Sequence, residues 1–214
     1  MFVPRRLTAV LAGVVMVGAT ALATSTPASA STSDSDNTSL AAVLTSDGNT
    51  FDHNSHDYDI LTEAVLAILA AKPNSPVGLV ADGDVALTVF APTDQAFRTL
   101  VRDLTGKRIS SEQKVFEAVA GLGIDTVETV VLYHVIPGAT IDKAAALASD
   151  GAVLTTAQGG TLTVSARTNH GFGVVRLLDK DPNAANPRVV QFDINQGNKQ
   201  IAHGINRVLR PSDL

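Results

Sequence analysis

The chain has 214 residues and carries 16 Lys and Arg against 21 Asp and Glu, a formal net charge of −5. This acidic balance argues against binding to nucleic acid or anionic lipid through long-range charge. The sequence contains no Cys, no Trp and only 4% aromatic residues, which excludes a disulfide framework and leaves little for stacking on sugars or bases.

Residues 1–30 are typical of a secretory signal peptide. Arg5 and Arg6 precede a nearly continuous apolar or small run, and Ala28-Ser-Ala30 is a small-x-small cleavage site. We therefore predict cleavage after Ala30 and a secreted, extracellular protein. No second apolar run of spanning length follows, so no membrane insertion is expected after cleavage.

The mature part is predicted to be one domain with a short leader. Residues 31–38 are polar, acidic and without periodicity, which indicates a flexible segment. Residues 39–214 have the length of a single domain with its own core.

Helical periodicity dominates the first part of this domain. A short helix is predicted over residues 39–45, and a longer one over residues 59–71 is ended by Lys72-Pro73. The apolar residues on one face of the longer helix are Leu61, Val65, Ile68 and Leu69.

A strand that leads into a capped helix follows. Residues 86–90 are predicted to form the strand, Pro92 to end it, and Thr93 to cap the next helix. Asp94 then lies in the first helical turn, where a negative charge suits the helix dipole. The predicted buried stripe of this helix is Phe97, Leu100, Val101 and Leu104.

Two later helices begin with a capping-box pattern. The pair Ser110 and Gln113 is predicted to open a helix that ends near residue 120. The pair Asp125 and Glu128 is predicted to open another that ends near residue 133. A last short helix is predicted over residues 141–149.

Beyond Gly151 the apolar pattern changes to a period of two, which is typical of strands. Turn sequences rich in Gly, Asn and Pro separate the strands. The predicted strands are residues 153–156, 161–165, 174–178, 189–194 and 201–209. Helices first and strands last predict an α+β fold with an antiparallel sheet.

Two segments, Thr88-Val-Phe-Ala-Pro-Thr-Asp-Gln-Ala-Phe97 and Leu132-Tyr-His-Val-Ile-Pro-Gly138, resemble the signature blocks of the fasciclin (FAS1) domain. Gly159-Gly-Thr-Leu-Thr-Val164 and Gly204-Ile-Asn-Arg-Val-Leu-Arg-Pro211 are similar to the family's mid-domain hairpin and closing strand. The structural motif positions in the two signature segments are Thr88, Pro92, Thr93, Asp94, Phe97, Pro137 and Gly138.

The resemblance implies a FAS1-like wedge of antiparallel β-strands packed with several short helices. It also implies a non-catalytic module for adhesion that binds a protein or a surface glycan and needs no cofactor. Tyr133 and His134 match the tyrosine–histidine motif to which part of the family's adhesive activity is assigned.

Candidate contact residues each have a structural alternative. We interpret His134 chiefly as a neutral core histidine that hydrogen-bonds the backbone where a helix meets a strand, with a binding role for Tyr133 and His134 as the alternative. Leu79 and Val80 lie in a long connection and are either contacts for a partner or a hook onto the core.

The loop Asp52-His-Asn-Ser-His-Asp57 is rich in possible metal ligands. His53 and His56 beside Asp52 and Asp57 suit Zn²⁺ or another transition metal. A solvated loop whose Asp residues cap the next helix explains the same residues. An exported metal- or small-ligand-binding protein that uses this loop is the alternative function.

The sequence is poor in catalytic motifs. It has no Gly-x-Ser-x-Gly elbow, no His-Glu-x-x-His and no phosphate-binding loop. We therefore predict that the protein is not an enzyme.

Overall fold

The computed structural model describes residues 37–46, 48, 50–52, 54–169 and 172–213. The predicted signal peptide and all but the end of the predicted leader lie outside these residues. Thr38, at that end, donates its N–H to Asn198 Oδ1 at 3.0 Å and accepts from Asn195 Nδ2 at 2.8 Å. Among the described helices, none combines the length and apolar character that crossing a bilayer requires.

The helices follow the predicted order, with one element that the sequence did not indicate, the 3-10 helix η2. They are α1 (Leu40–Leu44), α2 (Asp59–Ala71), η2 (Pro76–Ala81), α3 (Asp94–Thr105), α4 (Glu112–Ala120), α5 (Ile124–Tyr133) and α6 (Lys143–Ala148). The predicted bounds of α2 are confirmed.

Both predicted capping boxes are wrong in detail. The cap of α4 is Ser111 rather than Ser110, and its Oγ accepts the N–H of Lys114 at 3.4 Å. Helix α5 begins at Ile124 after Gly123, whose φ of 90° suits glycine, and no side chain caps it. Asp125 therefore lies inside the first turn instead of capping it.

The strands form two sheets. They are β1 (Leu87–Pro92), β2 (Val135–Pro137), β3 (Val153–Thr155), β4 (Thr161–Asn169), β5 (Phe172–Leu178), β6 (Val189–Ile194) and β7 (Gln200–Ile205). One sheet has the order β2-β1-β7-β6 and the other the order β3-β4-β5. The α+β fold class is confirmed.

One strand pair departs from the expected antiparallel arrangement. β1 pairs with β7 in parallel, whereas the other strand pairs are antiparallel. Every residue of β1 and of β7 is buried, which is typical of parallel strands covered on both faces. Strands from the two ends of the domain thus form its centre.

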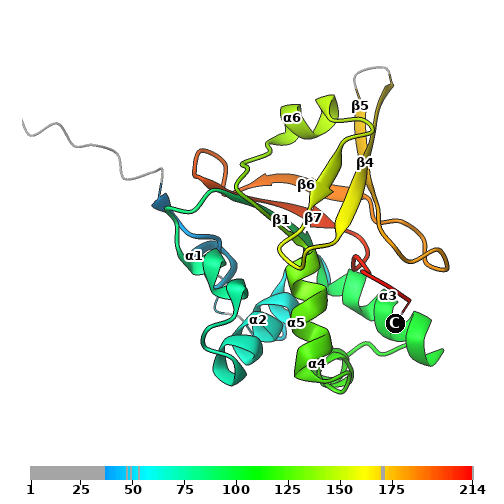
Figure 1. Ribbon diagram of the computed structural model, residues 1–214. Helices are drawn as coiled ribbons and strands as arrows, with labels where there is room; N and C mark the ends of the chain where they lie inside the picture. The colour runs from blue at the N-terminus through cyan, green and yellow to red at the C-terminus, as the bar shows by residue number, and fades with distance from the viewer. Residues whose placement is uncertain (1–36, 47, 49, 53, 170–171, 214) are drawn as a thin grey trace, which may run out of the picture. The chain divides into compact units, whose positions relative to one another are not determined.

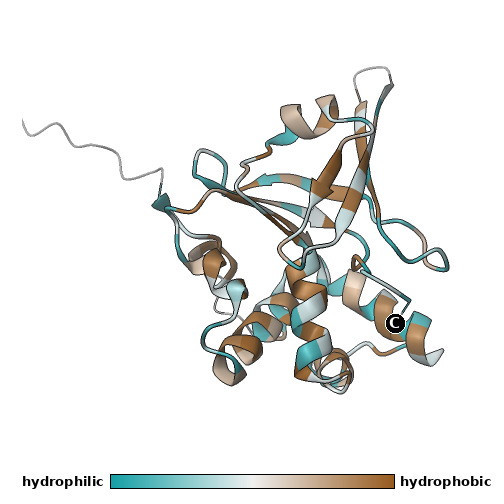
Figure 2. Cartoon of the chain, in the orientation of Figure 1, coloured by the Kyte–Doolittle hydropathy of each residue, from teal (hydrophilic) through white to brown (hydrophobic). Residues whose placement is uncertain are grey.

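Successive side chains of β1 enter two different cores, because a strand directs neighbouring residues to opposite faces. Leu87, Val89 and Ala91 pack into the core that α2, α3, α4 and α5 enclose. Phe90 packs into a second core with residues of β4, β5 and α6. Figure 1 shows the two groups of elements on either side of β1 and β7, and Figure 2 shows the apolar residues along α2 and α5.

The motif residues of β1 make local hydrogen bonds that shape the chain around it. Thr93 Oγ1 accepts the N–H of Ala96 at 3.3 Å, which confirms the predicted cap of α3. Thr88 Oγ1 donates to the carbonyl of Ala139 at 2.8 Å and accepts the N–H of Ile141 at 2.9 Å. The buried hydroxyl of Thr88 therefore fixes the segment that follows the Pro-Gly turn.

Asp94 lies in the first turn of α3, as predicted, and it also binds a second helix. Its carboxylate is fully buried, and Oδ1 accepts the N–H of Ile60 at 3.0 Å, in the first turn of α2. Helix α2 has no side-chain cap from Tyr58, its own N-cap residue. Asp94 therefore satisfies a free amide of a helix that precedes it by 34 residues.

His134 ties the end of α5 to the C-terminal segment. The side chain is 2% exposed, Nε2 accepts the N–H of Leu209 at 2.9 Å, and Nδ1 lies 2.7 Å from the carbonyl oxygen of Val130. Because Nε2 accepts a hydrogen bond, the proton of the neutral ring is on Nδ1, which donates a hydrogen bond to the carbonyl of Val130. Burial lowers the pKa of His134 to about 4, so the ring is neutral at pH 7.

We expect His134→Ala to lower the free energy of unfolding by about 1–3 kcal/mol, because it leaves buried backbone groups unpaired. Urea denaturation at pH 7 measures this effect. The control is His56→Ala, since His56 is exposed and its loss should cost less than about 0.5 kcal/mol. Equal denaturation midpoints for the two variants would contradict this role.

The contribution of His134 should also depend on pH. The folded-state pKa of about 4 lies below the unfolded value of 6.5, so acid protonates the unfolded state first. The contribution is complete above pH 6.5 and is lost as the pH falls towards 4, up to about 3 kcal/mol.

The difference in stability between the wild type and His134→Gln isolates this effect from other titrating groups. We expect urea midpoints that differ at pH 7 and converge at pH 4.5. A difference that stays constant over this range would show that His134 titrates alike in both states.

Candidate functional site

The tyrosine–histidine motif lies in the core. Tyr133 is fully buried, and its hydroxyl donates to the carbonyl of Thr161 at 2.7 Å, which joins α5 to β4. Burial is the main cause that raises the pKa of Tyr133 to about 12. With His134 bound to backbone on both sides, the two side chains join elements of the fold. Their direct part in binding a partner stays a prediction.

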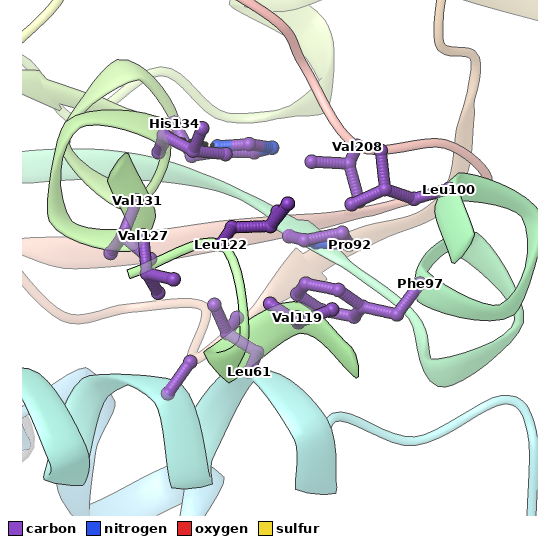
Figure 3. Close-up of a pocket in the computed structure, with 12 residues that line it drawn as sticks. Leu61, Pro92, Phe97, Leu100, Val119, Leu122, Val127, Val131, His134 and Val208 are labelled. Carbon is purple, nitrogen blue, oxygen red and sulfur yellow. Dashed lines mark hydrogen bonds between the residues drawn. The ribbon is translucent and has the colours of Figure 1, made fainter. Parts of the chain in front are cut away.

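A small apolar void lies on one side of His134. It has a volume of about 20 Å³. Figure 3 shows side chains from α2, α3, α4 and α5 converging on it, including Leu61, Phe97 and Val119. The volume suits one water molecule, but a buried water needs two or more polar partners, which this lining does not offer. We interpret the void as imperfect packing.

A larger apolar cavity lies between α1, α2 and η2. Its volume is about 190 Å³, and it shares Leu61, Val131 and His134 with the smaller void. Three of its lining residues are exposed and form the rim: Thr45, Leu66 and Ala81. Apolar cavities of about 150 Å³ stay dry and accept benzene. This cavity therefore has room for one apolar side chain or a small apolar molecule.

Gln200 holds the walls of this cavity in place. Its side chain is fully buried on β7, and Oε1 accepts the N–H of Leu40 at 2.7 Å, at the start of α1. Nε2 donates to the carbonyls of Leu79 at 2.8 Å and Asp82 at 2.6 Å, at the end of η2. Nothing in the sequence around Gln200 indicated these contacts, because its partners lie more than a hundred residues away.

The candidate contacts Leu79 and Val80 lie in η2. Val80 is buried and lines the larger cavity, whereas Leu79 is half-buried against the core. The structure thus gives this segment the geometry of a hook onto the core. A contact of these residues with a partner stays a prediction.

The predicted metal loop is only partly described. His53 lies outside the described residues, and the side chain of His56 is exposed. Asp52 and Asp57 each place a carboxylate oxygen within 4.8 Å of one of Asp59. The Zn²⁺ site at His53 and His56 stays a prediction.

A buried acidic cluster adjoins this loop, and the sequence reasoning did not find it. Asp59, Asp94 and Glu112 are buried and place oxygens within 4.8 Å of one another, and Arg98 Nη2 lies 2.7 Å from Glu112 Oε1. Burial, with help from neighbouring Asp57, raises the pKa of Asp94 to about 8, although the Ile60 amide opposes the shift. Each of these acids is the first residue of its helix, where sequence rules explain an acid by the helix dipole and do not indicate a buried cluster.

The family model of the fasciclin domain matches residues 61–211. Among solved structures, the chain is similar to a FAS1 domain pair from the insect cell adhesion molecule fasciclin I, with a TM-score of 0.54 and 15% identity. That match covers 82% of this chain and 51% of the insect chain, so this chain spans about half the length of that structure. No curated protein matches the chain.

The family match covers most of the chain and takes in both signature segments, and the structural match supports the same fold. The chain belongs to the fasciclin family.

Proposed function

We propose that this chain is an exported, non-catalytic binding module that adheres to a partner protein through the larger apolar cavity. The observation that carries this proposal is the cavity of about 190 Å³ that opens beside Leu66, whose side chain is 46% exposed. A buried floor with an exposed apolar rim is the form of site that accepts an anchor side chain from a partner.

Composition favours a protein over a glycan as the partner. Sugar-binding sites use aromatic faces, and this chain has no Trp and two Tyr. Tyr133 is buried, and Tyr58 points its hydroxyl at Gln191 Oε1, 2.9 Å away. An apolar anchor such as Leu or Phe, by contrast, matches the Leu and Val side chains that line the cavity.

Export and adhesion are supported by separate features. The sequence of residues 1–30 favours export, and the named function of the insect structure, a cell adhesion molecule, favours adhesion. The cavity lining contains no nucleophile beside a base, which fits a binding role rather than catalysis.

Two variants test the cavity. Leu66→Ser removes the apolar rim, and Val65→Phe adds bulk to the lining. Beads coated with the protein would be tested for adhesion to cell-surface and matrix extracts, and the captured partner's affinity would then be measured. We expect each variant to weaken binding about 10- to 100-fold, the equivalent of about 1.5–3 kcal/mol of lost apolar burial.

The matched control is Phe172→Ser, because Phe172 is the most exposed large apolar side chain among the described residues, at 80%. Phe172 belongs to β5, in the other sheet. Binding lost in Phe172→Ser and kept in Leu66→Ser would contradict the proposal and assign adhesion to the β3-β4-β5 sheet.

A further inference from the structure

Carboxyl groups from separate segments meet at the start of α2. Asp59 begins α2, Asp94 begins α3 and Glu112 begins α4, and their oxygens lie within 4.8 Å of one another. Asp52 and Asp57, in the loop before α2, have the same spacing with Asp59. Asp59 therefore joins an outer, partly exposed set to an inner, buried set.

The inner set is removed from water. Asp59, Asp94 and Glu112 are 3%, 0% and 1% exposed. The guanidinium of Arg98, bound to Glu112 at 2.7 Å, balances one negative charge of the cluster. Burial of ionised carboxylates is costly unless each is paired, hydrogen-bonded or protonated.

Two buried carboxylate oxygens, one from the outer set and one from the inner set, are available to a ligand. Asp94 Oδ2 and Asp57 Oδ1 are buried and accept no hydrogen bond from the described part of the chain. Asp94 uses its other oxygen, Oδ1, for the amide of Ile60. The Asp57 and Asp94 side chains lie within hydrogen-bonding reach of each other, so either a proton held between them or a bound cation satisfies these two oxygens.

We propose that the carboxylates of Asp57, Asp59 and Asp94 bind a calcium ion. Ca²⁺ prefers oxygen ligands at about 2.3–2.6 Å, so two ligands on opposite sides of the ion lie about 4.8 Å apart. Oxygens of Asp57 and Asp59 fit within that limit, as do oxygens of Asp59 and Asp94. Asp57 and Asp94 are close enough to share a side-chain hydrogen bond. Asp52, which is exposed, places an oxygen within 4.8 Å of oxygens of Asp57 and Asp59.

The types of ligand at this site favour Ca²⁺ over Zn²⁺. Zn²⁺ in proteins favours His and Cys, and the described members of the cluster are carboxylates. Glu112 remains with Arg98, so it balances the charge of the guanidinium instead of ligating the ion.

An ion at this position would fasten the acidic loop to the helices. Backbone bonds already join them, since the N–H of Asp94 donates to the carbonyl of Asp57 at 3.0 Å and that of Gln95 to Ser55 at 2.9 Å. Calcium would add ligand bonds between the same loop and the start of α3. None of the acidic residues lines the apolar cavity. The proposed calcium site therefore does not depend on that cavity.

The first test is titration of the chelator-treated protein with CaCl₂, by calorimetry and by thermal unfolding. We expect a dissociation constant between about 10⁻⁵ and 10⁻³ M and a rise of at least about 3 °C in Tm at saturating Ca²⁺. Asp94→Asn keeps an oxygen for the Ile60 amide but loses the charge. It should weaken Ca²⁺ binding by about 100-fold or more.

The matched control is Asp150→Asn. Asp150 Oδ1 also accepts a backbone amide, that of Ala166 at 2.9 Å, but it lies outside the cluster. This variant should keep the full response to Ca²⁺. Asp57→Asn, a second variant at a ligand position, should lose it and serves as the test if Asp94→Asn fails to fold.

Tyr58 offers a direct spectroscopic reading, because it lies between Asp57 and Asp59 and tyrosine sensitises the luminescence of bound Tb³⁺. Gly204 allows its position, since a Cβ there would clash with the Tyr58 hydroxyl. We expect Tb³⁺ emission that Ca²⁺ displaces and that Tyr58→Phe removes, while calorimetric Ca²⁺ binding persists in Tyr58→Phe.

Two outcomes would overturn the proposal. A folded wild type without heat or Tm change at 10 mM Ca²⁺, a concentration about tenfold above the weakest extracellular sites, would show that protons satisfy the acids. A response to Zn²⁺ alone that survives Asp94→Asn and is lost in His56→Ala would assign metal binding to the loop histidines.

Discussion

The neutral ring of His134 is the interaction on which the rest of the domain depends. It lies where α5 ends and β2 begins, and it binds the carbonyl of Val130 on one side and the amide of Leu209 on the other. A protonated ring has two donors and no acceptor, so it would leave the Leu209 amide unpaired. The buried ring therefore keeps the C-terminal segment against α5 only while it stays uncharged.

Other elements are held in the same way, by a buried polar side chain that comes from far along the sequence. Asp94 satisfies an amide at the start of α2, and Gln200 binds both α1 and the end of η2. Each of these side chains is fully buried, and loss of any one would leave backbone groups unpaired. The apolar cavity and the acidic cluster lie beside these anchors. Rigid supports of this kind are what a binding site requires.

Local sequence patterns predicted those elements that local contacts determine. Helix α2 and the Thr93 cap followed from periodicity and capping rules, and the structure confirms them. The rules failed where a distant partner decides. Helix α4 begins one residue later than the predicted box of Ser110 and Gln113, and its first residue, Glu112, pairs with Arg98 of α3. Helix α5 starts after Gly123 without a side-chain cap. The parallel pairing of β1 with β7 has no local signature at all.

In the candidate sites, too, local sequence patterns indicated some residues, whereas contacts between distant segments determine the others. The sequence singled out Tyr133, His134 and the loop that holds Asp57, but it gave no sign of Gln200 or of the convergence of Asp94 with Asp59. Those arrangements exist only after helices far apart in the chain have packed together. Burial also separates residues that look alike in the sequence, since His56 is exposed and His134 is not.

The most direct test of this account is a nitrogen-15 NMR spectrum of the His134 ring, recorded from pH 7 down to pH 5. We predict a neutral ring throughout, with the proton on Nδ1 and an unprotonated Nε2 that accepts a hydrogen bond from the Leu209 amide. A proton on Nε2, or protonation with an ordinary pKa near 6.5, would contradict it.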